Sequence, residues 1–472
     1  MNENDRSVIE LKKQIFYLYN FISSIANFFK QALAKIFSND RVLEGISRLD
    51  VNPKLLEKSK QKNNFDLAGT EAHIQDSPKR NKDVNWAQAR SGICAPSPLL
   101  FSKIEVAPAC EFYRNKTMID GGPVWPDFEY NEIVRHYRHD GPIDKNGRPT
   151  GAELLRIRRP AIWGGRMIPH FGHLVAEHMN RLAASLYYRP DDIVIFTTPP
   201  GIGKHRVPGY FWAIADWFGL PRNQIRLVKR PLLVDELRVT PQAECLLSCT
   251  PPAWHLDLLD EVAQLNRLKP EANDVVFVCR KGYLAMGKGG TAGEEALIEA
   301  LSRAGVLILD PARESLKRQM ELYAGAKILI FSEGSAVHGR QLLGRFQQKI
   351  LILSRRPNFE IAQTMLEPRC SDLEYVLPIT DFAAPIKITG ARMRPSGISF
   401  YDLDTLFSTF ARHGVALAEQ WDSEAYKLKA AQDAAAWYGR IISNSSIDQE
   451  KSRRVIQPVF EKQGMDIFSD RP

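Results

Sequence analysis

The sequence lacks an apolar run long enough to cross a membrane. Spanning a bilayer takes about 20 apolar residues, whereas the uncharged stretch 14–29 is shorter and contains Asn and Gln. No small-residue cleavage site accompanies it, so we expect no signal peptide. Apolar side chains recur every three or four residues from Ile15 to Ile36, which predicts an amphipathic helix over residues 6–37. This helix either lies on a membrane surface with its basic face outward or packs on protein.

Cysteine is scarce, and the few cysteines are scattered. Six occur in 472 residues, and only Cys245 and Cys249 lie close together. Neither a second pair nor a histidine stands at ligand spacing from them, so the sequence predicts no metal site. Because free thiols fit a reducing compartment, we expect a cytoplasmic protein, with peripheral attachment to the inner membrane face as the alternative.

Charge of one sign is only modestly in excess. The chain has 63 basic and 55 acidic residues, and its net charge is +8. This balance suits an anionic substrate or an anionic membrane surface. The interleaving of aromatic and basic residues that is typical of nucleic-acid modules is missing, so we expect no nucleic-acid partner.

The apolar content, 44%, is sufficient for more than one sizeable core. Two stretches alternate short apolar runs with helical patterns, and polar or helical segments flank them. We therefore predict the α/β class with two α/β domains and helical extensions at both ends. The predicted parts are an amphipathic helix (1–37), a polar linker (38–95), an N-terminal α/β domain (96–268), a C-terminal α/β domain (269–395) and a helical tail (396–472).

The most informative stretch runs from 275 to 345. Its apolar runs are bounded by polar residues, which is typical of strands buried on both faces. Thr291 and Glu294 fit a capping box at the start of the first helix. The predicted strands are 275–279, 306–309, 328–331 and 350–353, and the predicted helices are 294–301, 316–323 and 337–343. This alternation predicts a parallel sheet in which ligands bind beyond the carboxyl ends of the strands.

Two of these strand ends carry residues suited to binding an anion. Arg280 and Lys281 follow the first strand, and Glu333, Gly334 and Ser335 follow the third. Small residues at a helix start let an anion approach free backbone N–H groups. A phosphate-bearing ligand is the functional interpretation, and solvated charges with simple helix capping are the structural alternative.

A predicted helix over residues 168–186 carries a second candidate group. His173, Glu177 and Arg181 follow one another at four-residue steps along one face. An imidazole, a carboxylate and a guanidinium in one row can transfer protons and hold an anion. The alternative is a surface helix with ordinary pairs of charges, each worth a few tenths of a kcal/mol. His178 falls on the apolar side, as a core histidine would.

The two stretches together resemble glycosyltransferase family 61, over roughly residues 165–350. The family's first motif corresponds to the row from His173 to Arg181, and its second to a strand ending in Arg280. The third corresponds to a glutamine-bearing helix followed by a glycine turn with a nearby histidine. The chain departs from the family pattern at Glu333, where the family more often has histidine. A second arginine is also common after the first strand, and we expect Lys288 to substitute for it.

The resemblance implies a GT-B architecture, in which two Rossmann-like domains face a cleft. It also implies an inverting, metal-independent transfer from a nucleotide sugar to a glycan or polysaccharide, as in capsule synthesis, with no further cofactor. The acceptor would bind the N-terminal domain, with His173, Glu177 and Arg181 as catalytic residues. The donor would bind the C-terminal domain through Arg280, Lys281, Lys288, Glu294, Glu295, Gln319, Glu333, Gly334, Ser335 and His338.

Two other functions fit parts of the sequence. An oxidoreductase with a nucleotide cofactor would use the same sheets, but no G-x-G-x-x-G follows a strand with an acid about 20 residues later. A non-catalytic assembly protein attached to a membrane surface through residues 6–37 is the second alternative.

Overall fold

The computed structural model describes residues 84–108, 110–113, 117–119, 121–126, 135–138, 141–142, 153–198, 207–245 and 250–467. The chain divides into two compact units, 1–70 and 71–472, and every described residue belongs to the second. The predicted amphipathic helix and most of the predicted linker lie outside the described residues. Among the helices that are described, none combines the length and the apolar character that a membrane span needs.

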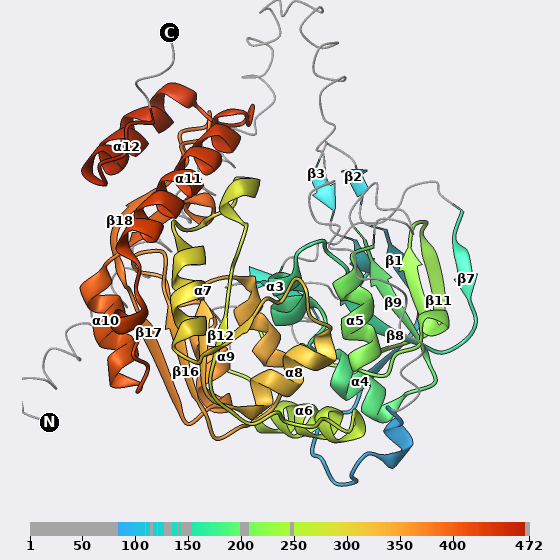
Figure 1. Cartoon of the computed structure of the whole chain (residues 1–472). Helices are drawn as coiled ribbons and strands as arrows, with labels where there is room; N and C mark the ends of the chain where they lie inside the picture. The colour runs from blue at the N-terminus through green and yellow to red at the C-terminus, as the bar shows by residue number, and fades with distance from the viewer. Residues whose placement is uncertain are drawn as a thin grey trace, which may run out of the picture. The chain divides into compact units, whose positions relative to one another are not determined.

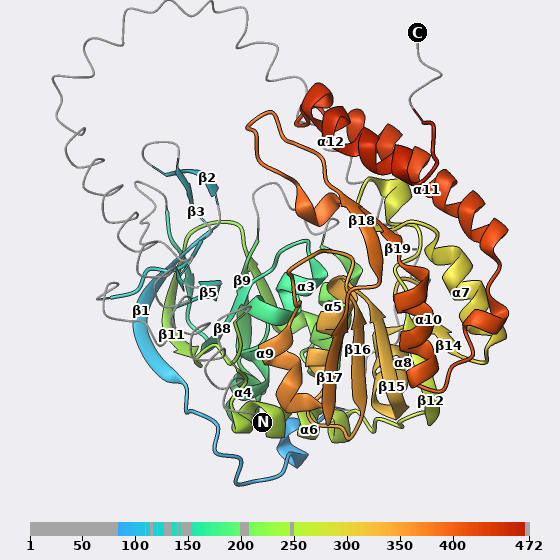
Figure 2. The same cartoon turned by 90° about the vertical axis from the view of Figure 1, so that its left-hand side faces the viewer.

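The C-terminal half contains a parallel five-stranded sheet (Figure 2). Its strands are β12 (Asn273–Val278), β14 (Leu307–Leu309), β15 (Ala326–Ser332), β16 (Lys349–Leu353) and β17 (Asp372–Val376). The spatial order β14-β12-β15-β16-β17 is the order 2-1-3-4-5 of doubly wound, Rossmann-like sheets. The four strands predicted from the sequence are confirmed, and β17 adds a fifth.

Both faces of this sheet are buried, which is why its strands are nearly continuous apolar runs. Phe277, Ile330 and Leu351 pack on one face against α7 and α10. Alternate residues, such as Val276 and Phe331, face α8. These helices are α7 (Glu294–Arg303), α8 (Leu316–Gly325) and α10 (Leu403–Arg412).

The N-terminal half is built on a mixed seven-stranded sheet. Its strands are β1 (Leu99–Ala107), β4 (Gly122–Pro123), β7 (Leu155–Ile157), β8 (Ala161–Arg166), β9 (Ile193–Thr197), β10 (Ile225–Val228) and β11 (Leu232–Val239). Strands β8, β9 and β10 are parallel neighbours, whereas β1 pairs antiparallel with β11 and with β4. Two small hairpins are formed by β2 (Cys110–Tyr113) with β3 (Thr117–Ile119) and β5 (Tyr137–Arg138) with β6 (Gly141–Pro142).

The predicted helix over 168–186 is not one continuous α-helix. It consists of a short α3 (Phe171–His173), a π-helical turn η4 (Leu174–His178) and α4 (Leu182–Tyr188). The surface-helix alternative is wrong, because Glu177 and Arg181 are both 0% exposed. A π-turn accommodates one extra residue in a helix and often occurs at functional sites.

The C-terminal segment covers a third sheet. Its strands are β13 (Gly290–Thr291), β18 (Ile379–Ala383) and β19 (Ile398–Tyr401), and its helices are α11 (Ser423–Ile442) and α12 (Gln449–Lys462). Phe400, Trp437 and Phe460 form its core. The predicted capping box is wrong, because Thr291 lies in β13 and its hydroxyl pairs with Ser399, while Gly293 caps α7.

The two halves share one core cluster. Helices α3, α5 (Gly209–Trp217) and α6 (Ala253–Leu265) belong to the N-terminal half, and α3 and α5 lie between the two large sheets in both views (Figures 1 and 2). Phe211 of α5 and Leu258 of α6 join the same cluster as Met320 of α8. The indole of Trp217 donates a hydrogen bond to the carbonyl oxygen of Leu342 at 3.2 Å. The segment that follows β15 is therefore held next to the N-terminal half.

Candidate functional site

The chain leaves the five-stranded sheet in opposite directions after two neighbouring strands, β12 and β15. The helix after β12, α7, packs on one face, whereas Val337 and Leu342 of the 3-10 helix η8 (Ser335–Leu342) pack on the other. Ligands of doubly wound sheets bind at such a switch point. Arg280 and Gly334 meet there, since a Cβ built on Gly334 would lie 2.3 Å from Nη1 of Arg280.

The Arg280 guanidinium is held from several sides. Its Nε donates to the carbonyl oxygen of Gly289 at 2.8 Å, and its Cζ lies 4.0 Å from the centre of the Tyr283 ring. Lys288 places its Nζ 5.4 Å from the same ring. Burial lowers the pKa of Arg280, and burial together with the charge of Arg280 lowers the pKa of Lys288. Both shifts show cations that are partly removed from solvent, as expected where an anion binds.

Glu294 lies beneath this switch point rather than at its opening. Its Oε1 accepts a hydrogen bond from the backbone N–H of Arg280 at 3.0 Å, and its carboxyl also bonds the side chain of Ser332. Burial raises the pKa of Glu294 to about 7. Glu294 thus ties the end of β12 to the end of β15.

Two further arginines lie beside Glu333, and they are not among the residues predicted from the sequence. Glu333 is fully buried, and its carboxylate accepts from the backbone N–H of Arg355 at 3.0 Å and from Nε of Arg356 at 2.6 Å. Burial lowers the pKa of Arg355 to about 9, and the charge of Arg356 contributes to the lowered pKa of Arg280. The signal was present, because Arg355 and Arg356 follow the predicted strand 350–353 as Arg280 follows the first strand.

Three other residues predicted to bind the sugar donor, Lys281, Glu295 and Gln319, are already paired with other groups of the protein. Lys281 and Glu295 form an ion pair at 2.6 Å, and their side chains are 44% and 46% exposed. Gln319 is buried, and its amide donates to the carbonyl oxygens of Pro311 and Glu314, which fixes the loop before α8.

The histidine segment, residues 168–186, contains a hydrogen-bonded pair of an imidazole and a carboxylate. Nδ1 of His173 lies 3.0 Å from Oε2 of Glu177, and the two side chains are 23% and 0% exposed. The ring of His178 stacks on His136 with centroids 4.4 Å apart. Arg181 is fully buried and donates to the carbonyl oxygens at positions 240 and 135, which ties α4 to neighbouring loops.

The histidine segment touches the glycine turn directly. A Cβ built on Gly172 would lie 2.7 Å from Cδ2 of His338 and 3.2 Å from Cβ of Ser335. Phe171 packs edge-on against Tyr210, with centroids 5.7 Å apart. The turn therefore has Arg280 on one side and α3 on the other, so the structure brings the two predicted groups of residues together.

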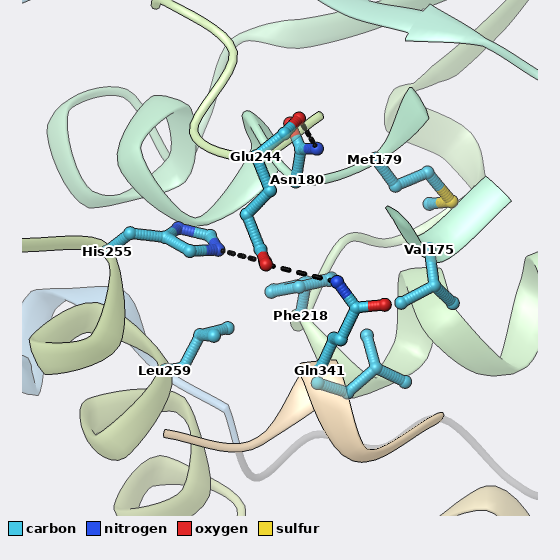
Figure 3. A pocket seen from close by; sticks show the side chains of 9 residues that line it. Val175, Met179, Asn180, Phe218, Glu244, His255, Leu259 and Gln341 are labelled. Atoms are coloured by element: carbon cyan, nitrogen blue, oxygen red, sulfur yellow. Dashed lines mark hydrogen bonds and ion pairs between the residues drawn. The ribbon is translucent and has the colours of Figure 1, made fainter. Parts of the chain in front are cut away.

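A buried polar network continues from His338 through Gln341, and Figure 3 shows its members Glu244, His255 and Gln341. The Glu244 carboxylate lies 3.0 Å from Nε2 of His255 and accepts from Gln341 at 3.0 Å and from Arg369 at 2.7 Å. Glu244, His255 and Gln341 line a small cavity with room for about one water molecule. The network joins the N-terminal half, through Glu244 and His255, to the C-terminal half.

Within the described residues, no group of three or more His, Cys, Asp or Glu side chains is arranged to hold a metal ion. A comparison with curated proteins gives no match to the chain. The model of the family described as Glycosyltransferase 61 matches residues 171–340, a segment that contains every site residue predicted from the sequence. The resemblance is thus confirmed over residues 171–340, the segment that matches glycosyltransferase family 61, and this family implies a glycosyltransferase.

Proposed function

We propose that this chain transfers a sugar from a nucleotide-sugar donor to a glycan or polysaccharide acceptor, with inversion and without a metal. The observation that carries the proposal is the position of Arg280 beside Gly334, at the switch point of a doubly wound sheet. Arg280 lies against one residue of the glycine turn, Gly334. Gly172, the neighbour of His173 in α3, lies against another, Ser335. In this proposal a cationic donor site lies next to His173 and Glu177, which can remove a proton from the acceptor.

The donor diphosphate would bind at the ends of β12, β15 and β16. Arg280, Arg356 and Lys288 would offset its charge, and the backbone N–H groups at the start of η8 would donate hydrogen bonds to it. Because Glu333 neutralises only part of the arginine charge, this region favours an anion. Guanidinium groups would then stabilise the charge that grows on the leaving diphosphate, which is the role that a metal plays in other transferases.

The acceptor would approach from the side of α3. We assign the base to His173, with Glu177 as the carboxylate that orients the ring and stabilises the imidazolium. The acceptor oxygen would bond to the anomeric carbon as the bond from that carbon to the diphosphate breaks. The hydroxyl proton would pass to Nε2 of His173, and the nucleoside diphosphate would leave as the anion. Arg181 would act indirectly, by holding the loops around α4.

This mechanism corresponds to a GT-B arrangement, with the acceptor on the N-terminal half and the donor on the C-terminal half. Burial raises the pKa of Tyr210 and the nearby Tyr283 adds to this rise, so the aromatic rings of the two halves lie near one another. Such rings suit the apolar face of a sugar or a base. We further propose a cytoplasmic protein, with residues 6–37 contacting the membrane surface or a protein partner.

The test is release of nucleotide from a panel of UDP-, GDP- and CMP-sugars, together with thermal shifts by the free nucleotides and by NAD(P). We expect one nucleotide family to stabilise the protein and NAD(P) to leave it unchanged. Arg280→Ala should weaken nucleotide binding by about 10- to 100-fold, because a charge-assisted bond is lost. Lys281→Ala is the matched control and should change binding less than about 2-fold, since Lys281 is exposed and already paired.

Two outcomes would contradict the proposal. Stabilisation by NAD(P) alone would favour the oxidoreductase alternative. Near wild-type transfer by both Glu177→Gln and His173→Ala would show that the base lies elsewhere.

A further inference from the structure

His338 lies at the junction between the glycine turn and α3. The residue is 5% exposed, and the Cδ2–Nε2 edge of its ring faces Gly172, with Nε2 3.4 Å from a Cβ built there. On the opposite edge, Nδ1 lies 2.6 Å from Oε1 of Gln341. Among the described residues, Nε2 makes no hydrogen bond. The ring thus has one nitrogen fixed by the protein and one directed to the candidate site.

Glu244 fixes the orientation of the Gln341 amide. Burial by itself would raise the pKa of Glu244, but Arg369 and His255 outweigh it and hold this pKa at about 2. Glu244 is therefore a carboxylate at neutral pH and can only accept hydrogen bonds. The Gln341 atom 3.0 Å from Oε2 of Glu244 must then be the amide nitrogen. It follows that the other Gln341 atom, next to His338, is the carbonyl oxygen.

This orientation determines where the His338 ring carries its hydrogen. The carbonyl oxygen of Gln341 is an acceptor, so Nδ1 of His338 must donate to it. Burial lowers the pKa of His338 and favours the neutral ring. Of the charged groups facing it, His173 acts in the same direction, whereas Glu177 and Glu244 favour the charged ring. In the neutral ring with hydrogen on Nδ1, Nε2 carries a lone pair.

We propose that Gln341 and Glu244 are positioning residues that hold His338 with its hydrogen on Nδ1, so that Nε2 accepts a hydrogen bond from a sugar hydroxyl. The proposal deepens, and rests on, the transferase function proposed above. A lone pair repels phosphate oxygens, whereas a hydroxyl can donate to it. His338 therefore recognises the sugar, and the diphosphate is left to Arg280 and its neighbours.

The tautomer can be measured without any substrate. Nitrogen-15 NMR of ¹⁵N-histidine-labelled, deuterated full-length protein distinguishes the two ring nitrogens, and the His338 signals are assigned by their loss in His338→Gln. We expect a protonated Nδ1 and an unprotonated Nε2 at pH 7.5. In Gln341→Met the acceptor is lost, and we expect the hydrogen to shift to Nε2 in a substantial fraction of molecules.

A matched control separates positioning from general disruption of the core. Gln348 is another buried glutamine, which accepts from Arg340 and donates to the carbonyl oxygens of Tyr323 and Ala326. Gln348→Met should lower the melting temperature but leave the His338 tautomer unchanged. A wild-type His338 with hydrogen on Nε2, or a Gln341→Met protein with an unchanged tautomer, would overturn the proposal.

Binding and turnover give the second readout. UDP and GDP should bind Gln341→Met within about 2-fold of wild type, because their phosphates do not contact His338, whereas kcat for the active nucleotide sugar should fall about 10-fold or more. A matching loss of UDP or GDP affinity would place His338 at the diphosphate and contradict the proposal. If no nucleotide binds the wild type, the transferase function fails, while the NMR result still decides the tautomer.

Discussion

Glu294 shows how one buried carboxyl can support a binding site that it does not enter. It accepts hydrogen bonds from the backbone of Arg280, which follows β12, and from Ser332, the last residue of β15. The protein keeps this group in an environment that disfavours its charge, since burial raises its pKa to about 7. A neutral acid costs less to bury and still presents an acceptor oxygen.

The raised pKa of Glu294 predicts a loss of stability as the pH rises. Between its ordinary value of 4.5 and about 7, the folded protein binds more protons than the unfolded chain, so stability falls over this window. The cost at pH 8 is about 3 kcal/mol. Glu294→Gln keeps the acceptor oxygen and cannot ionise. Its melting temperature should therefore decline less than that of the wild type between pH 5 and pH 8.

If the melting temperatures of the wild type and of Glu294→Gln declined equally between pH 5 and pH 8, the pKa of Glu294 would not be raised in the folded protein. Glu299 provides the control, because it is exposed on the same helix, α7, and pairs with Lys429. Glu299→Gln should leave the decline of the wild type unchanged.

Individual site residues could be predicted from the sequence where a rule about neighbouring residues applies. Arg280 and Gly334 follow apolar strands, and the rule that ligands bind beyond strand ends locates them. The same rule, applied to the strand 350–353, predicts Arg355 and Arg356 as well. The function of Glu294 was not accessible in this way, because Thr291 and Glu294 satisfy the spacing of a capping box. Only the distant Ser399, which pairs with Thr291 in the third sheet, excludes it.

Among the elements, α3 and η4 depart most from what the sequence indicates. Apolar spacing over residues 168–186 predicts one helix, and propensities do not distinguish an α-turn from a π-turn. A distant residue holds the end of the π-turn: Asn180 donates to the carbonyl oxygen of Ala176 within the turn and to that of Glu244, 64 residues away along the chain. The strands of the five-stranded sheet were predictable because burial on both faces gives them continuous apolar sequence.

The contact between α3 and η8 can be tested with two helical glycines. Gly172→Ala places a methyl group 2.7 Å from the His338 ring, which Gln341 fixes from behind, and we expect a destabilisation of about 1–3 kcal/mol with loss of transfer. In α11, Gly439 has no neighbour within 4 Å of a Cβ among the described residues. Gly439→Ala should therefore stabilise the protein by about 0.4–1 kcal/mol, through the lower entropy of the unfolded chain.

Thermal unfolding and transfer rates of the two variants measure this difference. If Gly172→Ala were as stable and as active as Gly439→Ala, α3 and η8 would not be in the close contact that the site requires.

At the scale of the whole described unit, the two α/β halves are not independent. Residues of α5 and α6 share a core with α8, and Glu244 from the N-terminal half binds Arg369 and Gln341 from the C-terminal half. The sequence predicted two α/β halves from their separate patterns. It carries no local signal for Glu244, because its partners lie 97 and 125 residues away along the chain.

The Glu244–Arg369 pair makes the joining of the halves depend on pH. The pKa of Glu244 in the folded protein, about 2, lies below its ordinary value of 4.5. The stabilisation that the ionised Glu244 contributes is therefore complete above pH 4.5 and is lost as the pH falls toward 2. Arg369→Met leaves Glu244 buried without its main counter-charge. We expect a loss of about 3–5 kcal/mol at neutral pH and a raised pKa of Glu244, so that the stability of the variant declines less in acid than that of the wild type. Arg345→Met is the control, since Arg345 is exposed and pairs with Asp257 at the surface.

The double variant Glu244→Gln with Arg369→Met shows whether the stability lost in Arg369→Met comes from the broken ion pair or only from lost side-chain packing. Removing the second charge removes the uncompensated carboxylate, so the double variant should regain part of the melting temperature lost in Arg369→Met. It should also lose the steep decline of stability in acid. Strictly additive losses in this cycle, with an unchanged acid profile, would mean that the two charges do not stabilise each other and that apolar packing alone joins the halves around the candidate site.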